Sequence, residues 1–141
     1  MFSSCGTNSE LVRTGAFYDI APRFLRTQGN KDYFRAYGKG SNEKECRVNA
    51  SSDLVKTLIY EGLREGTNMP PILNEPKAVA AFKAQEQQAL AGLVASKALV
   101  ENTGSPANRM RQSTDKNSLY SMSFDIGVDR SLLATEIARF K

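Results

Sequence analysis

The fold class of this chain is decided by residues 118–128, Ser-Leu-Tyr-Ser-Met-Ser-Phe-Asp-Ile-Gly-Val. Every second residue from Tyr120 to Val128 is apolar, and the residues between them are serine, aspartate or glycine. This period of two predicts a β-strand with one buried face and one solvated face. A single strand cannot satisfy its own backbone hydrogen bonds, so this strand requires partners.

A hairpin nearer the amino end is the candidate partner. Residues 33–37 are aromatic-rich and predict one strand, residues 38–42 predict a turn, and residues 45–49 predict the returning strand. Together with residues 118–128 they predict a small antiparallel sheet. Helices gathered on one face of that sheet would give an α+β fold. The alternative is that residues 118–128 pair with a strand from another chain.

Helical spacing of apolar residues predicts two helices, over residues 52–65 and 130–140. Each has a capping side chain just before or at its start. Ser51 or Ser52 can cap the first helix, and Asp129 can cap the second. Both helices are expected to bury their apolar faces in the core.

The longest predicted helix covers residues 75–101, where Asn74 is placed to cap it. About 26 residues would span roughly 39 Å, whereas a compact domain of this size is roughly 37 Å across. Two interpretations remain open: a central helix whose charged side chains reach water, or an arm that projects from the domain. A shorter helix is expected over residues 21–28, with Pro22 in its first turn and Gly29 after its end.

Length and composition predict one domain. The chain has 141 residues, of which 40% are hydrophobic and 24% are charged, as in ordinary soluble globular proteins. No apolar run approaches the ~20 residues that span a bilayer, and the start does not resemble a secretory signal. These features predict a cytoplasmic or organelle-internal protein, in which Cys5 and Cys46 are either free or bridged, and free thiols are the expected state.

Two segments are expected to lie outside the packed core. Residues 1–10 are small and polar, which predicts a flexible N-terminus. Residues 102–117 have no apolar periodicity and carry several cations. This second segment is either a flexible basic loop or a segment that becomes ordered on a partner.

Positive charge is concentrated between residues 11 and 50. The chain has a formal net charge of +4, and this region alone holds eight cations, four carboxylates and half of the aromatic residues. The excess suits an acidic protein surface, nucleic acid or anionic lipid. Composition by itself does not choose among these partners.

The sequence contains no histidine. Histidine is the commonest general base and metal ligand, so Ser-His-Asp and Cys-His catalytic arrangements and histidine-containing metal sites are excluded. Two cysteines are too few for a thiolate metal cage. We therefore predict no catalytic residues, no metal and no cofactor.

These observations predict a non-enzymatic assembly or linker subunit that binds acidic protein partners in a larger complex. Arginine and tyrosine are favoured at protein interfaces because they combine contact area with hydrogen bonding. The alternative is a nucleic-acid-binding protein that uses the aromatic–basic region 13–47. A third, less favoured interpretation is a small enzyme. The predicted partner-binding residues are Arg13, Arg23, Arg26, Tyr33, Arg35, Tyr37, Arg47, Arg109 and Arg111.

Overall fold

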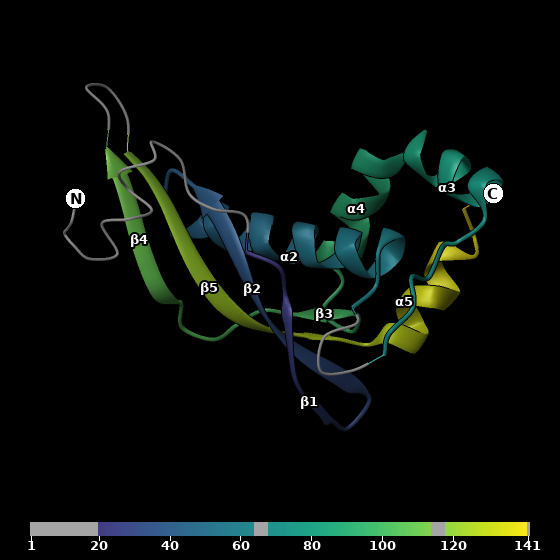
Figure 1. The fold of residues 1–141 in the computed structure, drawn as a ribbon, viewed down its shortest axis with the longest axis horizontal. Coiled ribbons are helices and arrows are strands. Elements are labelled where there is room, and N and C mark those ends of the chain that lie inside the picture. The colour runs from purple at the N-terminus through teal and green to yellow at the C-terminus, as the bar shows by residue number, and fades with distance from the viewer. Residues whose placement is uncertain (1–19, 64–67, 114–117, 141) are drawn as a thin grey trace.

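The strand predicted over residues 118–128 forms the centre of the sheet, with the bounds that the sequence pattern indicates. The computed structural model describes residues 20–63, 68–113 and 118–140, and all strand pairs within them are antiparallel. Helices and one antiparallel sheet make an α+β fold, as predicted (Figure 1). In spatial order the sheet contains β1 (Arg23–Gln28), β2 (Lys31–Gly40) and β5 (Ser118–Val128), and both β3 (Val100–Glu101) and β4 (Ala107–Ser113) pair with the far edge of β5.

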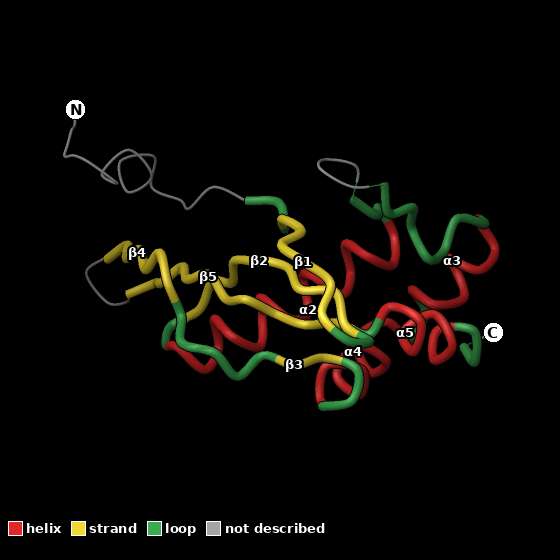
Figure 2. The backbone as a smooth tube through the Cα atoms, turned by 90° about the horizontal axis from the view of Figure 1, so that it is seen from below, coloured by secondary structure: helices red, strands yellow, loops and turns green. Residues whose placement is uncertain are grey.

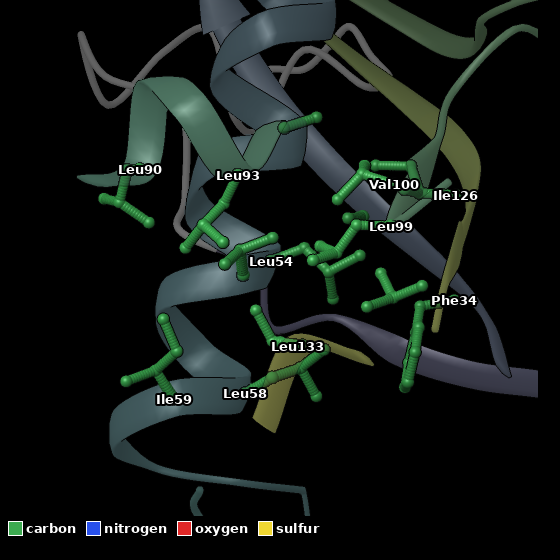
Figure 3. Packing of buried hydrophobic residues seen from close by; sticks show 14 of the residues in the cluster. Phe34, Leu54, Leu58, Ile59, Leu90, Leu93, Leu99, Val100, Ile126 and Leu133 are labelled. Carbon is green, nitrogen blue, oxygen red and sulfur yellow. The ribbon is translucent and has the colours of Figure 1, made fainter. Parts of the chain in front are cut away.

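Helices pack against one face of this sheet. The longest, α2, lies across β2 and β5 (Figure 2). Phe34 of β2 and Ile126 of β5 are fully buried beneath it, together with Leu54 of α2 itself. Figure 3 shows these side chains meeting leucines from α4 and α5 in one apolar core. The helices in the described residues are α2 (Glu43–Tyr60), α3 (Pro76–Lys83), α4 (Glu86–Ala95) and α5 (Arg130–Ile137).

The predicted strand over residues 45–49 is wrong, because these residues belong to the first turns of α2. Asn42 caps the helix: its side-chain oxygen accepts a hydrogen bond from the backbone N–H of Glu45 at 2.9 Å. The Glu45 carboxylate in turn accepts hydrogen bonds from the backbone N–H and hydroxyl of Ser41, each at 2.9 Å. These bonds lower the pKa of Glu45. This reciprocal cap starts the helix nine residues before the predicted range, and Ser51, one of the two expected caps, is buried inside it.

The C-terminal end of α2 also differs from the predicted helix, which covered residues 52–65. The helix ends at Tyr60, and Gly62 adopts a left-handed conformation with φ of 73°. The backbone N–H of Gly62 donates to the carbonyl of Thr57 at 2.8 Å. A glycine is suited to this position because other residues pay a steric cost there.

The predicted helix over residues 21–28 is also wrong. Residues 23–28 form β1, which pairs with β2 in a hairpin. Gly29 provides the turn between them, with φ of 64°. The predicted strand 33–37 is confirmed and extends over the whole of β2, so the hairpin partner precedes β2 in sequence rather than following it.

The last predicted helix, 130–140, begins where expected and ends at Ile137. Asp129 caps it by accepting the backbone N–H of Leu132 at 3.0 Å. The same carboxylate accepts a hydrogen bond from the Asn30 side chain at 3.0 Å. This contact joins the β1–β2 turn to the start of α5.

The predicted helix 75–101 is divided into α3 and α4, followed by β3. The division allows Phe82 of α3 to contact the rings of Tyr60 and Phe140. At the start of α4, the Tyr60 hydroxyl donates to the Glu86 carboxylate at 2.5 Å, and Lys56 lies 3.9 Å from the same carboxylate. Neither the central nor the projecting long helix forms, and these tertiary contacts accompany the break between α3 and α4.

The Tyr60–Glu86 contact predicts a specific loss of stability in alkali. Burial, together with the hydrogen bond and charge of Glu86, raises the pKa of Tyr60 above its ordinary value. In the unfolded chain this tyrosine ionises near pH 10, so the free energy of unfolding should fall as the pH rises above that value. In Tyr60→Phe this part of the decline should be missing, at a cost near neutral pH of about 1 kcal/mol.

Urea unfolding of the two proteins as a function of pH measures this effect. The two proteins differ at residue 60 alone, so the difference between the two profiles isolates Tyr60. Parallel profiles from pH 8 to pH 11 would show that the hydrogen bond to Glu86 does not form.

The segment 102–117, predicted to be a loop, contains a strand. Residues 107–113 form β4, which pairs with β5. A bulge lies between Ala107 and Met110, and Asn108 has a φ of 51°. Residues 114–117 of this segment, and the N-terminus predicted over residues 1–10, lie outside the described residues.

Cys46 lies in α2 and is fully buried as a free thiol. Its sulfur lies 3.5 Å from the carbonyl oxygen of Tyr120. Burial, with a contribution from the carboxylate of Glu45, raises the pKa of this thiol. A buried, protonated thiol is a packing element rather than a nucleophile. Cys5 lies outside the described residues.

Candidate functional site

The face of the sheet opposite α2, here called the outer face, carries most of the predicted binding residues. Side chains alternate along a strand, and Phe34 and Ala36 of β2 point into the core. Tyr33, Arg35 and Tyr37 therefore point to the outer face. The register of β2 with β1 and β5 arranges their neighbours in rows that cross the strands.

One row is built around the ring of Tyr33. The Arg26 guanidinium of β1 lies over this ring, 4.7 Å from its centroid. On the other side, Gly127 of β5 leaves space for the ring, because a Cβ at this position would lie 2.8 Å from it. The Tyr33 hydroxyl donates to Glu101 of β3 at 3.4 Å, and Lys31 lies 3.7 Å from the same carboxylate. Tyr33 and Arg26 are thus held by contacts within the chain.

The next row contains Arg23, Arg35 and Asp125, on β1, β2 and β5. Arg35 donates its Nε–H to the Asp125 carboxylate at 3.2 Å. Both side chains remain nearly half exposed, at 44% and 47%. Arg23 is exposed and has no ion pair or hydrogen bond from its side chain to another described residue. Two arginines therefore stand opposite each other, and one carboxylate, Asp125, lies beside Arg35 on the side away from Arg23, an arrangement that folding alone does not favour.

Beyond this row lies Tyr37, opposite Ser123 of β5. Tyr37 is partly exposed, and its hydroxyl and ring have no hydrogen bond or ring contact with another described residue. Ser123 is buried because Asn108 covers it and donates to its hydroxyl at 2.8 Å. The buried serine thus leaves Tyr37 as the partly exposed member of this row.

Charge on the outer face is strongly positive. Within the described residues, the strand register places five cations on this face and two carboxylates, Asp125 and Glu101. Each carboxylate already contacts a cation of the same face. The cations are Arg23, Arg26, Lys31, Arg35 and Lys39.

Arg47, another predicted binding residue, lies on α2 and away from the outer face. Its guanidinium donates to the backbone carbonyl of Asn102 at 2.9 Å and to the Asn102 side chain at 3.1 Å. It also lies 3.2 Å from Glu43 and 4.8 Å from the centroid of the Phe124 ring. These contacts join α2 to the segment that follows β3.

Arg109 and Arg111 of β4 are exposed but do not join the rows of the outer face. Arg109 lies 3.7 Å from Glu43 at the start of α2. Arg111 donates to the hydroxyl of Ser118 at 3.1 Å. They form a separate basic area on the outermost strand. Arg13 lies outside the described residues.

These positions predict different costs for removing two arginines. Arg47→Ala should lower the free energy of unfolding by about 2 kcal/mol, because it leaves a partly buried carbonyl and an aromatic face without their partner. Arg23→Ala should change it by less than about 0.5 kcal/mol, as is usual for an exposed residue without partners. Urea unfolding followed by circular dichroism measures both. Equal costs for the two variants would contradict the division between the outer face and the α2 side.

A cavity of about 600 Å³ lies between α4 and α5. Leu93, Leu132 and Phe140 contribute to its apolar walls. Glu136 is the ionisable residue among those that line it, and it lies 3.6 Å from Arg139. The cavity therefore adds no candidate acid–base pair.

The sequence alone did not identify Asp125, Glu101 or Gly127 as parts of the site. Asp125 alternates with buried residues, which indicates an exposed face. Its pairing with Arg35, ninety positions away, depends on the register of β2 and β5. No sequence pattern marked Gly127 as part of the site, because its role is to leave space for the Tyr33 ring.

Comparison with protein-family models finds no match, and comparisons with curated proteins and with solved structures find no significant similarity. None of the helices in the described part of the chain has both the length and the hydropathy needed to cross a bilayer. Residues 20–63, 68–113 and 118–140 also contain no group of three or more side chains arranged to hold a metal ion.

Proposed function

We propose that this protein is a non-enzymatic assembly or linker subunit that binds an acidic surface of a protein partner through its outer face. The observation that supports this is the row of Arg23 and Arg35, which face each other with one carboxylate, Asp125, beside them. An acidic partner would supply the missing negative charge. The proposal places the protein in the cytoplasm or inside an organelle.

The residues of the outer face suit a protein interface. Glu101 and Arg26 fix Tyr33 in place, and Tyr33 and Gln28 fix Arg26, so both side chains lose little conformational entropy on binding. Tyr37 and Arg23 can contribute new contact area and hydrogen bonds. Complementary charge would increase the association rate and orient the partner.

The test compares affinity purification of the wild-type protein and Arg23→Gln/Arg35→Gln from the native source. A stoichiometric protein partner should be retained by the wild type and lost by the double variant, whose circular dichroism spectrum should be unchanged. Arg139→Gln is the matched control, because Arg139 is 72% exposed on the segment after α5. Retention of the partner by the double variant would exclude the outer face as the interface.

A second candidate function, binding of single-stranded nucleic acid, is favoured by Tyr37. Its ring is free within the described residues and lies between Arg35 and Lys39 on the outer face, as in sheets that stack bases on aromatic side chains. Tyr33 is less suited to stacking, because Arg26 already lies over its ring. An oligothymidylate should then bind with an affinity that falls steeply with salt and weakens in Tyr37→Ala. No binding at low salt would exclude this function.

A further inference from the structure

Most cations of the outer face already have a partner within the chain. Lys31 lies 3.7 Å from Glu101. Arg26 lies over Tyr33 and donates to the Gln28 side chain at 3.3 Å. Lys39 also has a partner. These cations are therefore not free to follow the evenly spaced charges of an extended polyanion.

The available donors are concentrated at one point. Arg23 has no side-chain partner in the described residues, and Arg35 uses its Nε–H for Asp125. The terminal nitrogens of Arg35 make no hydrogen bond with the described residues, so they remain available at the strand position opposite Arg23. Because the two arginines are direct cross-strand neighbours, their guanidinium groups can reach the same ligand.

We propose that Arg23 and Arg35 bind a phosphate monoester on a side chain of the protein partner, an inference that rests on the proposed function. The row of Arg23, Arg35 and Asp125 has two positive charges and one negative charge, and Arg26 of the neighbouring row adds a third positive charge, so that the excess is two. The excess matches the charge of a phosphorylated side chain, about −1.5 to −2 at neutral pH. A single carboxylate would leave half of the excess uncompensated. Guanidinium groups also match phosphate oxygens in geometry.

The shape of the surface favours a phosphate carried by a macromolecule over a free one. Small ligands are usually held in concave pockets. Within the described residues, neither Arg23 nor Arg35 lines the cavities beside α2, α4 or α5. An exposed strand surface instead fits an extended segment that presents one phosphorylated residue.

The experiment uses glutamate-rich peptides that contain one serine, each prepared with and without phosphate on that serine. Fluorescence anisotropy measures their affinity for the wild type, for Arg23→Gln/Arg35→Gln and for Arg139→Gln. The phosphorylated forms should bind the wild type and Arg139→Gln about tenfold more tightly than the unphosphorylated forms. The double variant should bind both forms equally. Asp125→Asn should bind the phosphorylated forms severalfold more tightly than the wild type, because a competing carboxylate is removed.

The outcomes separate the inference from the proposed function. Equal binding of both peptide forms by the wild type would overturn the phosphate site and leave acidic-partner binding intact. Failure of both forms to bind would overturn both. A phosphate preference that persists in the double variant would show that other residues recognise the phosphate. Inorganic phosphate that displaces the peptide at the peptide's own concentration would show that the site binds free phosphate instead.

Discussion

Gly38→Ala is expected to lower the free energy of unfolding by at least about 3 kcal/mol, a large part of the total for a small domain. A Cβ at this position would lie 1.9 Å from the carbonyl oxygen of Cys46 and 2.5 Å from the backbone nitrogen of Ala50. Both are backbone atoms of α2, so a rotamer change cannot relieve the contact. The helix would have to move away from β2 and open the core beneath it.

Gly92→Ala is the matched control. Gly92 lies in α4, and a Cβ there would meet no atom within 4 Å. This substitution should raise the free energy of unfolding by about 0.5–1 kcal/mol, since alanine loses less backbone entropy in a helix than glycine. Urea unfolding of both variants, followed by circular dichroism, measures the contrast. A Gly38→Ala protein within about 1 kcal/mol of the wild type would show that α2 does not approach β2 so closely.

The parts of the fold that the sequence predicted correctly have strong local signals. The alternation from Tyr120 to Val128 defines β5, and Asp129 caps α5 as its position indicated. The start of α2 had a local signal too, because Asn42 and Glu45 have the spacing of a reciprocal cap. The expectation of a hairpin after residue 37 obscured that signal.

The remaining errors have tertiary causes. No glycine or proline lies between Lys83 and Glu86, and the break between α3 and α4 accompanies contacts made by Phe82 and Glu86 with α2. The sequence of β4 has no apolar alternation because most of its described side chains are exposed at the edge of the sheet. Such an edge strand becomes recognisable only when its partner is known.

The candidate site was predictable in part. Tyr33, Arg35 and Tyr37 share a face because they are two residues apart on a strand, which the period of two implies. The sequence does not reveal that Arg23 stands opposite Arg35. Pro22 and Gly29 predict a helix over residues 21–28, so no strand was expected there. The separation of Arg47 from the outer face likewise follows from the helical start of α2, which the predicted strand had assigned to the sheet.

Phe82→Ala is expected to lower the free energy of unfolding by about 3–5 kcal/mol, the usual cost of truncating a buried phenylalanine. The Phe82 side chain is fully buried. Its ring packs edge-to-face on Tyr60, with centroids 6.1 Å apart, and on Phe140, with centroids 5.5 Å apart. These contacts hold α3 against α2 and the segment after α5, so truncation leaves a cavity where three parts of the chain meet.

Phe82→Leu separates this packing role from a general sensitivity of α3. Leucine fills much of the same volume, so its cost should stay below about 1.5 kcal/mol. Urea unfolding gives both values, and the Phe82→Ala protein should also show increased amide hydrogen exchange in α3. A small cost for Phe82→Ala, within about 1 kcal/mol of the wild type, would mean that α3 does not pack on this core. The division of the alanine-rich segment into two helices would then need a cause other than the burial of Phe82.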